Sequence, residues 1–431
     1  MDISLRLMVT RLVTYSWNKI FNHPPSPEVI QQIKTFFVFG TGMLTAKIMS
    51  IAAQIIMGRK FGPEVYGQLT MILLLSGYFA MPIVNGWGLV FTKIAAREKD
   101  EKKKEQALKA LLLVVGACGV ITIFLLFFLQ SPLANLLDIT PRSMKLTLLM
   151  TVFYVWWILT KQVAQGLQNW HAYIIIENIW AILVLSGIIA LLVWSKCNLA
   201  TVSGAFFVGY FLSGLVLFKN IWQSFFVRIR KEYIKDILSH GWFLLINGLV
   251  GVATFSIDRV LLNRSLGAEE VGIYQAHFLS TYGIISAFMT ILITYIFPIF
   301  CRNDNMQSVL NKINKIQYPV TVFISIAIGG VVLWMYSYPV SLALFGSLCL
   351  FNAVQCHVQL KTWYLASRGA NESKIFFKSQ LIFLSVNVLM LIILIKKIGI
   401  VAGGVSLLVA ACASLAYLIK SEHIIPYERS V

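Results

Sequence analysis

Long apolar runs recur along the whole chain, separated by short polar segments. Twelve runs can be distinguished, each close to the roughly 20 residues that a helix needs to cross a bilayer. An isolated strand cannot satisfy its backbone polar groups in lipid, so each run is expected to be a helix. The twelve predicted spans cover residues 35–57, 67–91, 108–130, 145–164, 171–194, 199–221, 238–262, 273–300, 317–336, 339–360, 375–395 and 399–419.

The composition agrees with an all-α polytopic membrane protein. Of 431 residues, 58% are hydrophobic and 13% are charged, whereas about 25% are charged in an average soluble domain. This composition excludes an ordinary soluble enzyme, a disordered tail and a secreted disulfide scaffold. The six cysteines lie far apart or inside apolar runs, without a CxxC pair. We therefore expect no metal site and no cofactor.

Basic residues lie mostly between the apolar runs. An even number of spans places both termini on one side of the membrane, and that side holds 26 Lys and Arg residues against 9 on the other. The positive-inside rule then predicts that both termini are cytoplasmic. We attribute the net charge of +18 to the basic residues that set the topology and to attraction to anionic lipid. No nucleic-acid partner is expected.

The spans are expected to form two lobes of six helices, residues 35–221 and residues 238–419. A basic cytoplasmic linker, residues 222–237, joins them. Residues 1–34 contain an amphipathic stretch and then a proline-rich break, which predicts a segment lying in the cytoplasmic interface. Residues 420–431 are predicted to be a cytoplasmic tail.

A short motif occurs after the first span and again after the seventh. Residues 59–67 read RKFGPEVYG and residues 264–272 read RSLGAEEVG, so both fit R-x-[F/L]-G-x-E-x-x-G at an offset of 205. The first glycine is expected to end one helix, and the second to start the next span. The two copies predict parallel six-helix repeats with a cavity between them, as in transporters. The shared positions are Arg59, Gly62, Glu64, Gly67, Arg264, Gly267, Glu269 and Gly272.

Residues 62–67, 256–260 and 266–274 resemble the polysaccharide-exporter branch of the multidrug/oligosaccharidyl-lipid/polysaccharide exporter (MOP) superfamily. Within that branch, the chain is most similar to the Wzx-type O-antigen repeat-unit flippases. The resemblance implies a V-shaped, two-lobed exporter in the bacterial inner membrane. It would move an undecaprenyl-diphosphate-linked oligosaccharide to the outer leaflet, with the bilayer and other polysaccharide-assembly proteins as further partners.

Lys47 lies halfway along the first span, where a charge costs about 2.5–3.5 kcal/mol on insertion scales. At 100° per residue, Gln54 lies within about 60° of it, so the two residues belong to one polar stripe. We interpret this stripe as a substrate-binding face on which Lys47 anchors a diphosphate. The alternative is structural: Lys47 pairs with a carboxylate such as Glu177 or Asp258, or extends to the interface.

A second polar stripe follows the seventh span. Asn247 and Asp258 fall within about 40° of His240 at the same helical spacing, and we expect these three residues and Arg259 to contact substrate. Adjacent helical residues are roughly 100° apart, so Asp258 and Arg259 are not expected to face each other. A histidine such as His240 is more often a packed polar residue than a ligand.

Two carboxylates are candidates for coupling transport to an ion. Asp258 lies on the second stripe, although a structural pair near the headgroups is equally open. Glu177 lies two turns into the fifth span, and its alternative role is to pair with Lys161 or a neighbouring helix. A membrane carboxylate is a functional candidate by default because burying its charge is costly.

The sequence does not favour an enzyme. It contains no HExxH, GxSxG, P-loop or glycine-rich nucleotide motif, and all predicted extracytoplasmic loops are short, which argues against a membrane-embedded polysaccharide polymerase. The main alternative is an ion-coupled drug or cation antiporter of the same superfamily. A cavity for cations would favour carboxylates, whereas Lys47 favours an anionic substrate.

Overall fold

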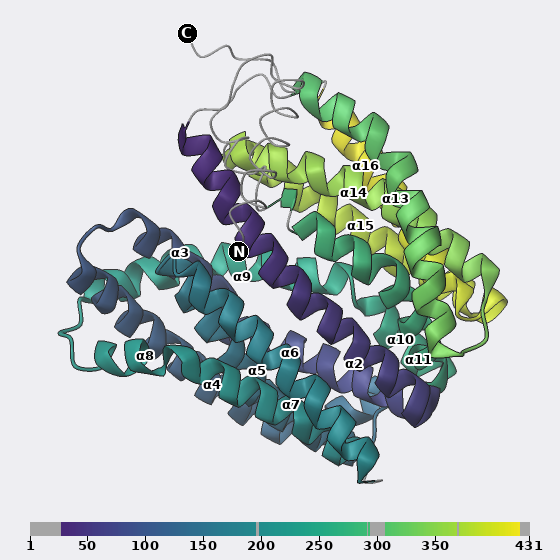
Figure 1. Ribbon diagram of the computed structural model, residues 1–431, viewed down its shortest axis with the longest axis horizontal. Coiled ribbons are helices and arrows are strands. Elements are labelled where there is room, and N and C mark those ends of the chain that lie inside the picture. Colours follow the sequence, from purple (N-terminus) through teal and green to yellow (C-terminus); the bar gives the residue numbers. More distant parts are fainter. Residues whose placement is uncertain (1–26, 195–197, 291, 294–306, 369, 423–431) are drawn as a thin grey trace, which may run out of the picture.

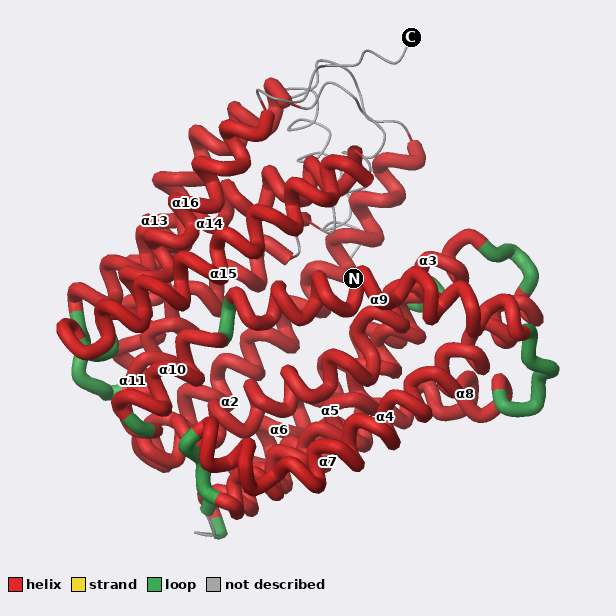
Figure 2. The backbone as a smooth tube through the Cα atoms, turned by 180° about the vertical axis from the view of Figure 1, so that it is seen from behind, coloured by secondary structure: helices red, strands yellow, loops and turns green. Residues whose placement is uncertain are grey.

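Most of the predicted N-terminal interfacial segment and of the C-terminal tail lies outside the residues that the structure describes. Every regular element among the described residues is a helix, and the helices form two diverging groups (Figure 1). The same two groups are seen from behind in Figure 2. The computed structural model describes residues 27–194, 198–290, 292–293, 307–368 and 370–422.

The N-terminal lobe follows the predicted order of spans. Its first helix bends sharply at Gly62, so that one continuous element contains the first span and the start of the second. The lobe comprises α2 (Pro27–Ala80), the π-helical turn η1 (Met81–Asn85), α3 (Gly86–Arg97), α4 (Glu101–Leu137), α5 (Pro141–Gly166), α6 (Trp170–Val193), α7 (Leu199–Gly214), the 3-10 turn η2 (Leu215–Leu217) and α8 (Phe218–Ser224).

The C-terminal lobe departs from the prediction at its first span, which is two helices and not one. Ser256 has a non-helical backbone, with φ −147° and ψ −13°. Its hydroxyl donates to Tyr78 and to the carbonyl of Val252, and such side-chain bonds compete with the helical ladder. The elements are α9 (Lys231–Thr254), α10 (Ile257–Leu266), α11 (Ala268–Phe278), the π-helical turn η3 (Leu279–Gly283), α13 (Gln307–Tyr336), α14 (Leu342–Arg368), α15 (Ala370–Ile398) and α16 (Val401–Glu422).

The predicted fold class is confirmed. Among the described residues, ten helical segments are long and apolar enough to cross a membrane. One of them, Val38–Arg97, contains the first two predicted spans. The eighth predicted span is described only in part, as α11, η3 and the helical residues that follow them. The protein is therefore an all-helical, polytopic membrane protein with two lobes.

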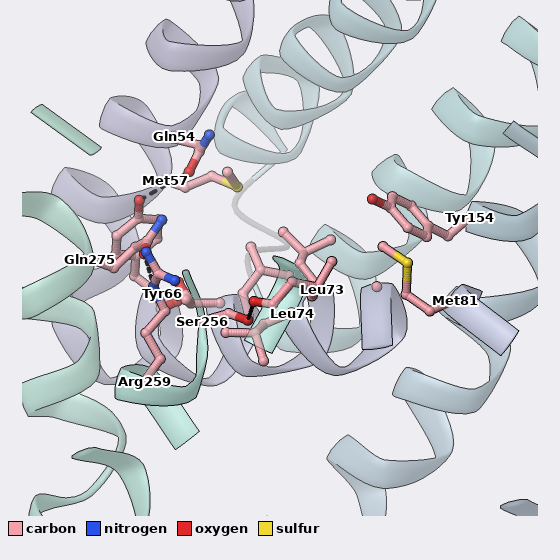
Figure 3. Close-up of a pocket in the computed structure, with 14 residues that line it drawn as sticks. Gln54, Met57, Tyr66, Leu73, Leu74, Met81, Tyr154, Ser256, Arg259 and Gln275 are labelled. Carbon is pink, nitrogen blue, oxygen red and sulfur yellow. Dashed lines mark hydrogen bonds between the residues drawn. The ribbon is translucent and has the colours of Figure 1, made fainter. Parts of the chain in front are cut away.

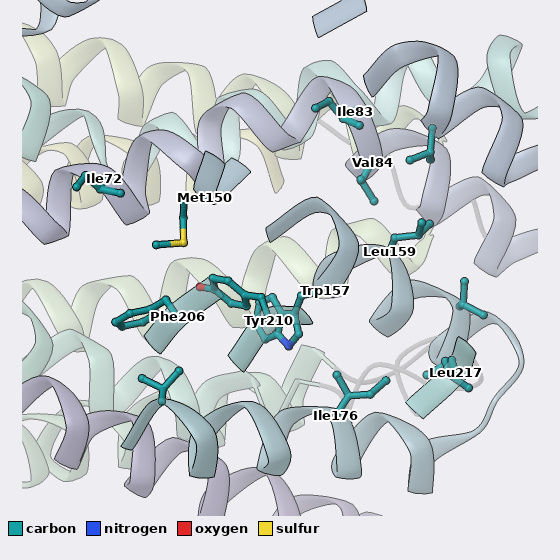
Figure 4. Close-up of a cluster of buried hydrophobic side chains, with 14 of the residues drawn as sticks. Ile72, Ile83, Val84, Met150, Trp157, Leu159, Ile176, Phe206, Tyr210 and Leu217 are labelled. Atoms are coloured by element: carbon teal, nitrogen blue, oxygen red, sulfur yellow. The ribbon is translucent and has the colours of Figure 1, made fainter. Parts of the chain in front are cut away.

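Two large clusters of buried side chains form the interior, each lying mostly in one lobe and taking a few residues from the other. The core of the N-terminal lobe includes Trp157, Phe206 and Tyr210, which Figure 4 shows between the helices. The C-terminal core includes Phe351 and Phe383. Lipid tails are as apolar as leucine, so this interior is stabilised mainly by close van der Waals packing and not by exclusion of water.

The lobes meet at one end and diverge at the other. α11 packs against α2 where the chain leaves its bend, and Figure 1 shows the helices spreading apart from this region, towards α3 and α8 on one side and α13 and α16 on the other. On one flank, α9 packs against α3 and α4 of the N-terminal lobe and also against α15. The arrangement is a V whose closed end carries the two copies of the repeated motif.

Candidate functional site

The first glycine of each motif copy ends a helix, as the sequence predicts. Gly62 has φ +80° and ψ 167°, and Gly267 has φ +93° and ψ 174°. A side chain at such a positive φ would be strained, so glycine is required at both positions. The shared backbone conformation at an offset of 205 supports the interpretation of the two segments as structural repeats.

The second glycine of each copy has a different role from the predicted one. Gly67 and Gly272 lie inside helices that have already begun, and they pack against each other's segment. A Cβ on Gly67 would lie 1.7 Å from the carbonyl oxygen of Ala268, and a Cβ on Gly272 would lie 2.0 Å from that of Pro63. Only glycine permits this backbone contact, which joins the lobes at the closed end.

Polar contacts surround this glycine contact. The hydroxyls of Tyr66 and Tyr336 lie 3.1 Å apart, and Tyr338 donates a hydrogen bond of 2.6 Å to the carbonyl oxygen of Gly58. Asn263 of the C-terminal lobe donates to the carbonyl oxygens of Leu137 and Asp138 at the end of α4. The charged motif residues Arg59, Glu64, Arg264 and Glu269 are exposed around this contact.

A cavity of about 350 Å³ lies directly beneath the closed end, near the lower limit of the 300–1,000 Å³ that is typical of small-molecule sites. In Figure 3, Tyr66, Arg259 and Gln275 approach it from one side, whereas Tyr154 and Met81 lie on the other. Both lobes contribute to its wall. The lining residues are Gln54, Met57, Tyr66, Leu69, Thr70, Leu73, Leu74, Gly77, Met81, Tyr154, Val252, Ser256, Arg259 and Gln275.

Two pairs of lining residues occupy equivalent positions in the repeats. The motif offset of 205 relates Gln54 to Arg259 and Thr70 to Gln275, and all four residues line the cavity. The sequence predicts Gln54 and Arg259, Gln54 because it shares a helix face with Lys47. It does not predict Thr70 and Gln275, because they belong to neither polar stripe. Extending the motif offset into the neighbouring helices would have found them.

The charges of the C-terminal lobe are paired within α10 and α11. Nη1 of Arg259 lies 3.6 Å from Oδ1 of Asp258, so the prediction that these adjacent residues do not face each other is wrong. Tyr274 donates to the other oxygen of Asp258. Arg259 also donates to Gln275 at 2.7 Å, and to the carbonyl oxygen of Phe255 at 2.6 Å. The break at the start of α10 leaves that carbonyl free to accept, which holds the guanidinium near the carboxylate.

The charges of the N-terminal lobe are arranged on three helices. Nζ of Lys161 lies 2.5 Å from Oε1 of Glu177 and 3.8 Å from the ring centroid of Trp157, which confirms the alternative role of Glu177 as the partner of Lys161. Lys47 is exposed and interacts electrostatically with both residues. It forms no ion pair within 4 Å among the described residues. This group of Lys47, Lys161 and Glu177 is called the N-lobe charge cluster.

The predicted second stripe is out of phase with the cavity. His240 is exposed, and its Nδ1 lies 3.0 Å from the hydroxyl of Ser239 and from the carbonyl oxygen of Asp236. Asn247 is half-buried and its Oδ1 has no hydrogen-bond partner among the described atoms. Neither residue lines the cavity described above. The break at residues 255 and 256 shifts the helical phase, so that Ser256 and Arg259 face the cavity.

Comparisons with known proteins agree with this architecture. Residues 33–304 match the family described as polysaccharide biosynthesis protein. No curated protein matches the chain significantly in sequence.

Three solved structures show the relationship in fold. An inward-facing multidrug resistance MATE family transporter of the MOP superfamily has a TM-score of 0.71 and 12% identity, over 90% of this chain and 96% of that one. An outward-facing MATE family transporter has a TM-score of 0.60 and 14% identity, over 92% and 95%. The lipid II flippase MurJ, in an inward closed conformation, has a TM-score of 0.57 and 13% identity, over 90% and 87%. The chain therefore belongs to the polysaccharide biosynthesis protein family and has the fold of MOP superfamily transporters.

Proposed function

We propose that this protein is a Wzx-type flippase that moves an undecaprenyl-diphosphate-linked oligosaccharide from the cytoplasmic to the outer leaflet. The observation that carries the proposal is the N-lobe charge cluster, which combines two lysines with one glutamate inside the membrane. Its second cation, Lys47, is exposed and forms no ion pair with any residue that the structure describes. A cation in a partly wet, low-dielectric space attracts a diphosphate strongly.

The position of Lys47 fits a route by which the substrate headgroup would move from the open end towards the closed end. Gln54 lines the cavity, and seven residues of helix place Lys47 roughly 10 Å away on nearly the same face. Because α2 runs from the open end to the closed end, Lys47 is the nearer of the two to the opening (Figure 1). The diphosphate would contact Lys47, while the polyprenyl chain stays in lipid.

The cavity beyond Lys47 suits a sugar better than a second anion. Its hydrogen-bonding groups are two glutamines, a threonine, a serine, two tyrosines and Arg259, and the charge of Arg259 is balanced by Asp258. Amides and hydroxyls both donate and accept, as sugar hydroxyls require. We therefore assign the leading sugar residue to this cavity.

The proposed mechanism is alternating access in the bacterial cytoplasmic membrane. With both termini cytoplasmic, as the distribution of basic residues predicts, the contact between Gly67 and Gly272 would close the outer side. Rocking of the lobes would break that contact and release the headgroup outwards. Glu177 and Asp258 remain candidates for ion coupling, although each already has a cationic partner.

An ion-coupled drug or cation antiporter is the second candidate. A site for cations would need an available carboxylate in the cavity. The cavity lining among the described residues contains none, and the adjacent Asp258 is paired with Arg259 and accepts from Tyr274. The charge distribution therefore favours the lipid-linked anion.

The proposal is tested by deleting the gene in its host and analysing the extracted polyprenyl-linked intermediates. We expect complete repeat units to accumulate on the lipid while surface polysaccharide is lost. Truncated units would indicate a sugar transferase, and single unpolymerised units at the surface would indicate a polymerase. An unchanged lipid pool with new drug sensitivity would support the antiporter.

The role of Lys47 is tested by complementing the deletion with Lys47→Ala. We expect export to be abolished at normal protein levels, because the diphosphate loses its cation, and to be partly restored by Lys47→Arg. Lys60→Ala is the matched control, because Lys60 is an exposed cation at a motif position that the two copies do not share. Normal export in Lys47→Ala would remove Lys47 from the mechanism.

A further inference from the structure

A groove of about 700 Å³ runs along the first three turns of α9, outside the inter-lobe cavity. Its lining residues recur at intervals of three and four, so they form one face of the helix. Cations lie at the N-terminal end of this face, and apolar side chains follow. The described lining residues are Lys231, Ile234, Lys235, Leu238, Ser239 and Trp242.

This face of α9 does not contribute to the inter-lobe cavity: the only α9 residue among the described lining of that cavity is Val252, about three turns beyond Trp242. The helix packs through another face, because Ile237, about 130° from the centre of the groove face at 100° per residue, belongs to the core of the N-terminal lobe. Leu238 and Trp242 are exposed, the latter to 61%. Exposed apolar side chains next to cations are typical of a surface that contacts lipid.

The chemistry of the groove matches a lipid with a negatively charged headgroup. Lys231 and Lys235 lie one turn apart on the same face, and the described lining contains no carboxylate. Arg228 and Arg230, in the segment just before α9, are also exposed. Lysine side chains of this kind lie along apolar surface and keep their ammonium groups at the headgroup level.

Trp242 closes the apolar end of the groove. Its ring packs edge-on against Trp87 of α3, with centroids 6.0 Å apart and an interplanar angle of 76°. This contact gives the tryptophan a fixed orientation although most of its surface is exposed. A rigid aromatic surface about two turns below the lysines provides a wall for an acyl chain.

We propose that this groove binds one anionic phospholipid of the cytoplasmic leaflet, with its phosphate between Lys231 and Lys235 and an acyl chain along Leu238 and Trp242. The lipid would lie on α9, the helix that packs against α3 and α4 in one lobe and α15 in the other. The site does not depend on which molecule the protein transports.

The experiment is native mass spectrometry of the purified full-length protein titrated with phosphatidylglycerol or phosphatidylcholine. We expect tighter binding of phosphatidylglycerol to the wild type. In Lys231→Gln/Lys235→Gln, the affinity for phosphatidylglycerol should fall roughly thirtyfold, taking about 1 kcal/mol for each lysine near an anionic headgroup. Lys99→Gln/Lys102→Gln removes the same charge from the exposed loop before α4 and the first turn of that helix, and this loop variant should bind like the wild type.

Three outcomes would overturn the proposal. An equal loss in the loop variant would mean that only net charge matters. Displacement of phosphatidylglycerol by millimolar inorganic phosphate would indicate a site for free phosphate. Binding of undecaprenyl phosphate but not phosphatidylglycerol would make the groove part of the substrate route.

A second measurement locates the bound lipid. Phosphatidylglycerol with brominated acyl chains should quench tryptophan fluorescence in the wild type more than in Trp242→Phe, because bromine quenches only nearby rings. Equal quenching in the two proteins would place the acyl chain elsewhere and contradict the assignment.

Discussion

The two lobes share a repeated motif at their contact but differ in how their charges are held. In the C-terminal lobe, Asp258 and Arg259 are consecutive residues whose partners lie on α10, on α11 or in the break just before α10. In the N-terminal lobe, Lys47, Lys161 and Glu177 come from α2, α5 and α6. The first group balances its charge locally, whereas the second leaves a positive excess on an exposed lysine.

This difference indicates that the two lobes have different roles: one shapes the cavity and the other binds the anion. A locally paired charge keeps its partners when the lobes move, so the pair in the C-terminal lobe can shape the cavity without attracting counterions. An excess charge spread over three helices attracts an anion, and the strength of that attraction depends on how the three helices pack. Repetition of the motif therefore gives the lobes a common closing surface, while sequence divergence assigns the anion-binding role to one lobe.

The strongest test of the comparison is Glu177→Leu. Removing the carboxylate leaves Lys161, whose side chain is only 18% exposed, without its ion-pair partner, and such a loss typically costs about 3–5 kcal/mol. We expect a large fall in thermal stability in detergent. The double variant Lys161→Met/Glu177→Leu should recover most of that loss. If the double variant is no more stable than the single one, the pair does not act as a unit.

The pair in the C-terminal lobe is tested by Tyr274→Phe. The change removes the hydrogen bond to the buried carboxylate of Asp258 and should lower stability by about 1.5–3 kcal/mol, the usual range for a bond to a charged group. Tyr417→Phe is the control, because the hydroxyl of Tyr417 has no hydrogen bond among the described residues. Equal stability of the two variants would show that Asp258 does not need this donor.

The common closing surface is tested by Gly67→Ala and Gly272→Ala. Each methyl group would overlap a backbone carbonyl of the other lobe, so each should destabilise the closed outer side by about 1–3 kcal/mol. The readout is labelling of Gln54→Cys by a membrane-impermeant thiol reagent added from outside, which should increase equally in both backgrounds.

Gly116→Ala is the control for the glycine variants, because a Cβ at Gly116 meets open space. Increased labelling with this control would point to a general loosening of the protein. An increase with only one motif glycine would contradict the reciprocal contact.

The smallest effect is expected for an ion pair with an exposed carboxylate in the first turn of α4. Lys104 lies 2.7 Å from Glu101, whose side chain is 76% exposed. Such pairs contribute about 0.5 kcal/mol or less, so Lys104→Ala should leave thermal stability and export nearly unchanged. If Lys104→Ala lowered thermal stability as much as Tyr274→Phe, exposed charges would contribute more to stability than the contrast between the two lobes implies.

The sequence predicts the membrane-spanning helices and several cavity residues, but not how the helices and side chains contact one another. Gln54 and Arg259 were selected because charged and polar groups are costly in lipid, and both line the cavity. The contact between Asp258 and Arg259 was missed, since ideal helical angles ignore the bending of a long arginine side chain, which here is held back towards its neighbour by the carbonyl oxygen of Phe255. Gln275 was missed because an uncharged side chain in an apolar run gives no signal of its own.

The sequence by itself determined that the chain is a bundle of membrane helices with two related halves. Lipid leaves helices as the workable solution for each long apolar run, and the repeated motif marks the corresponding points of the halves. The tertiary structure alone decided that Gly67 and Gly272 close one end, that Glu177 pairs with Lys161, and that Lys47 remains exposed. These outcomes depend on the relative placement of helices far apart in the chain, which local periodicity does not encode.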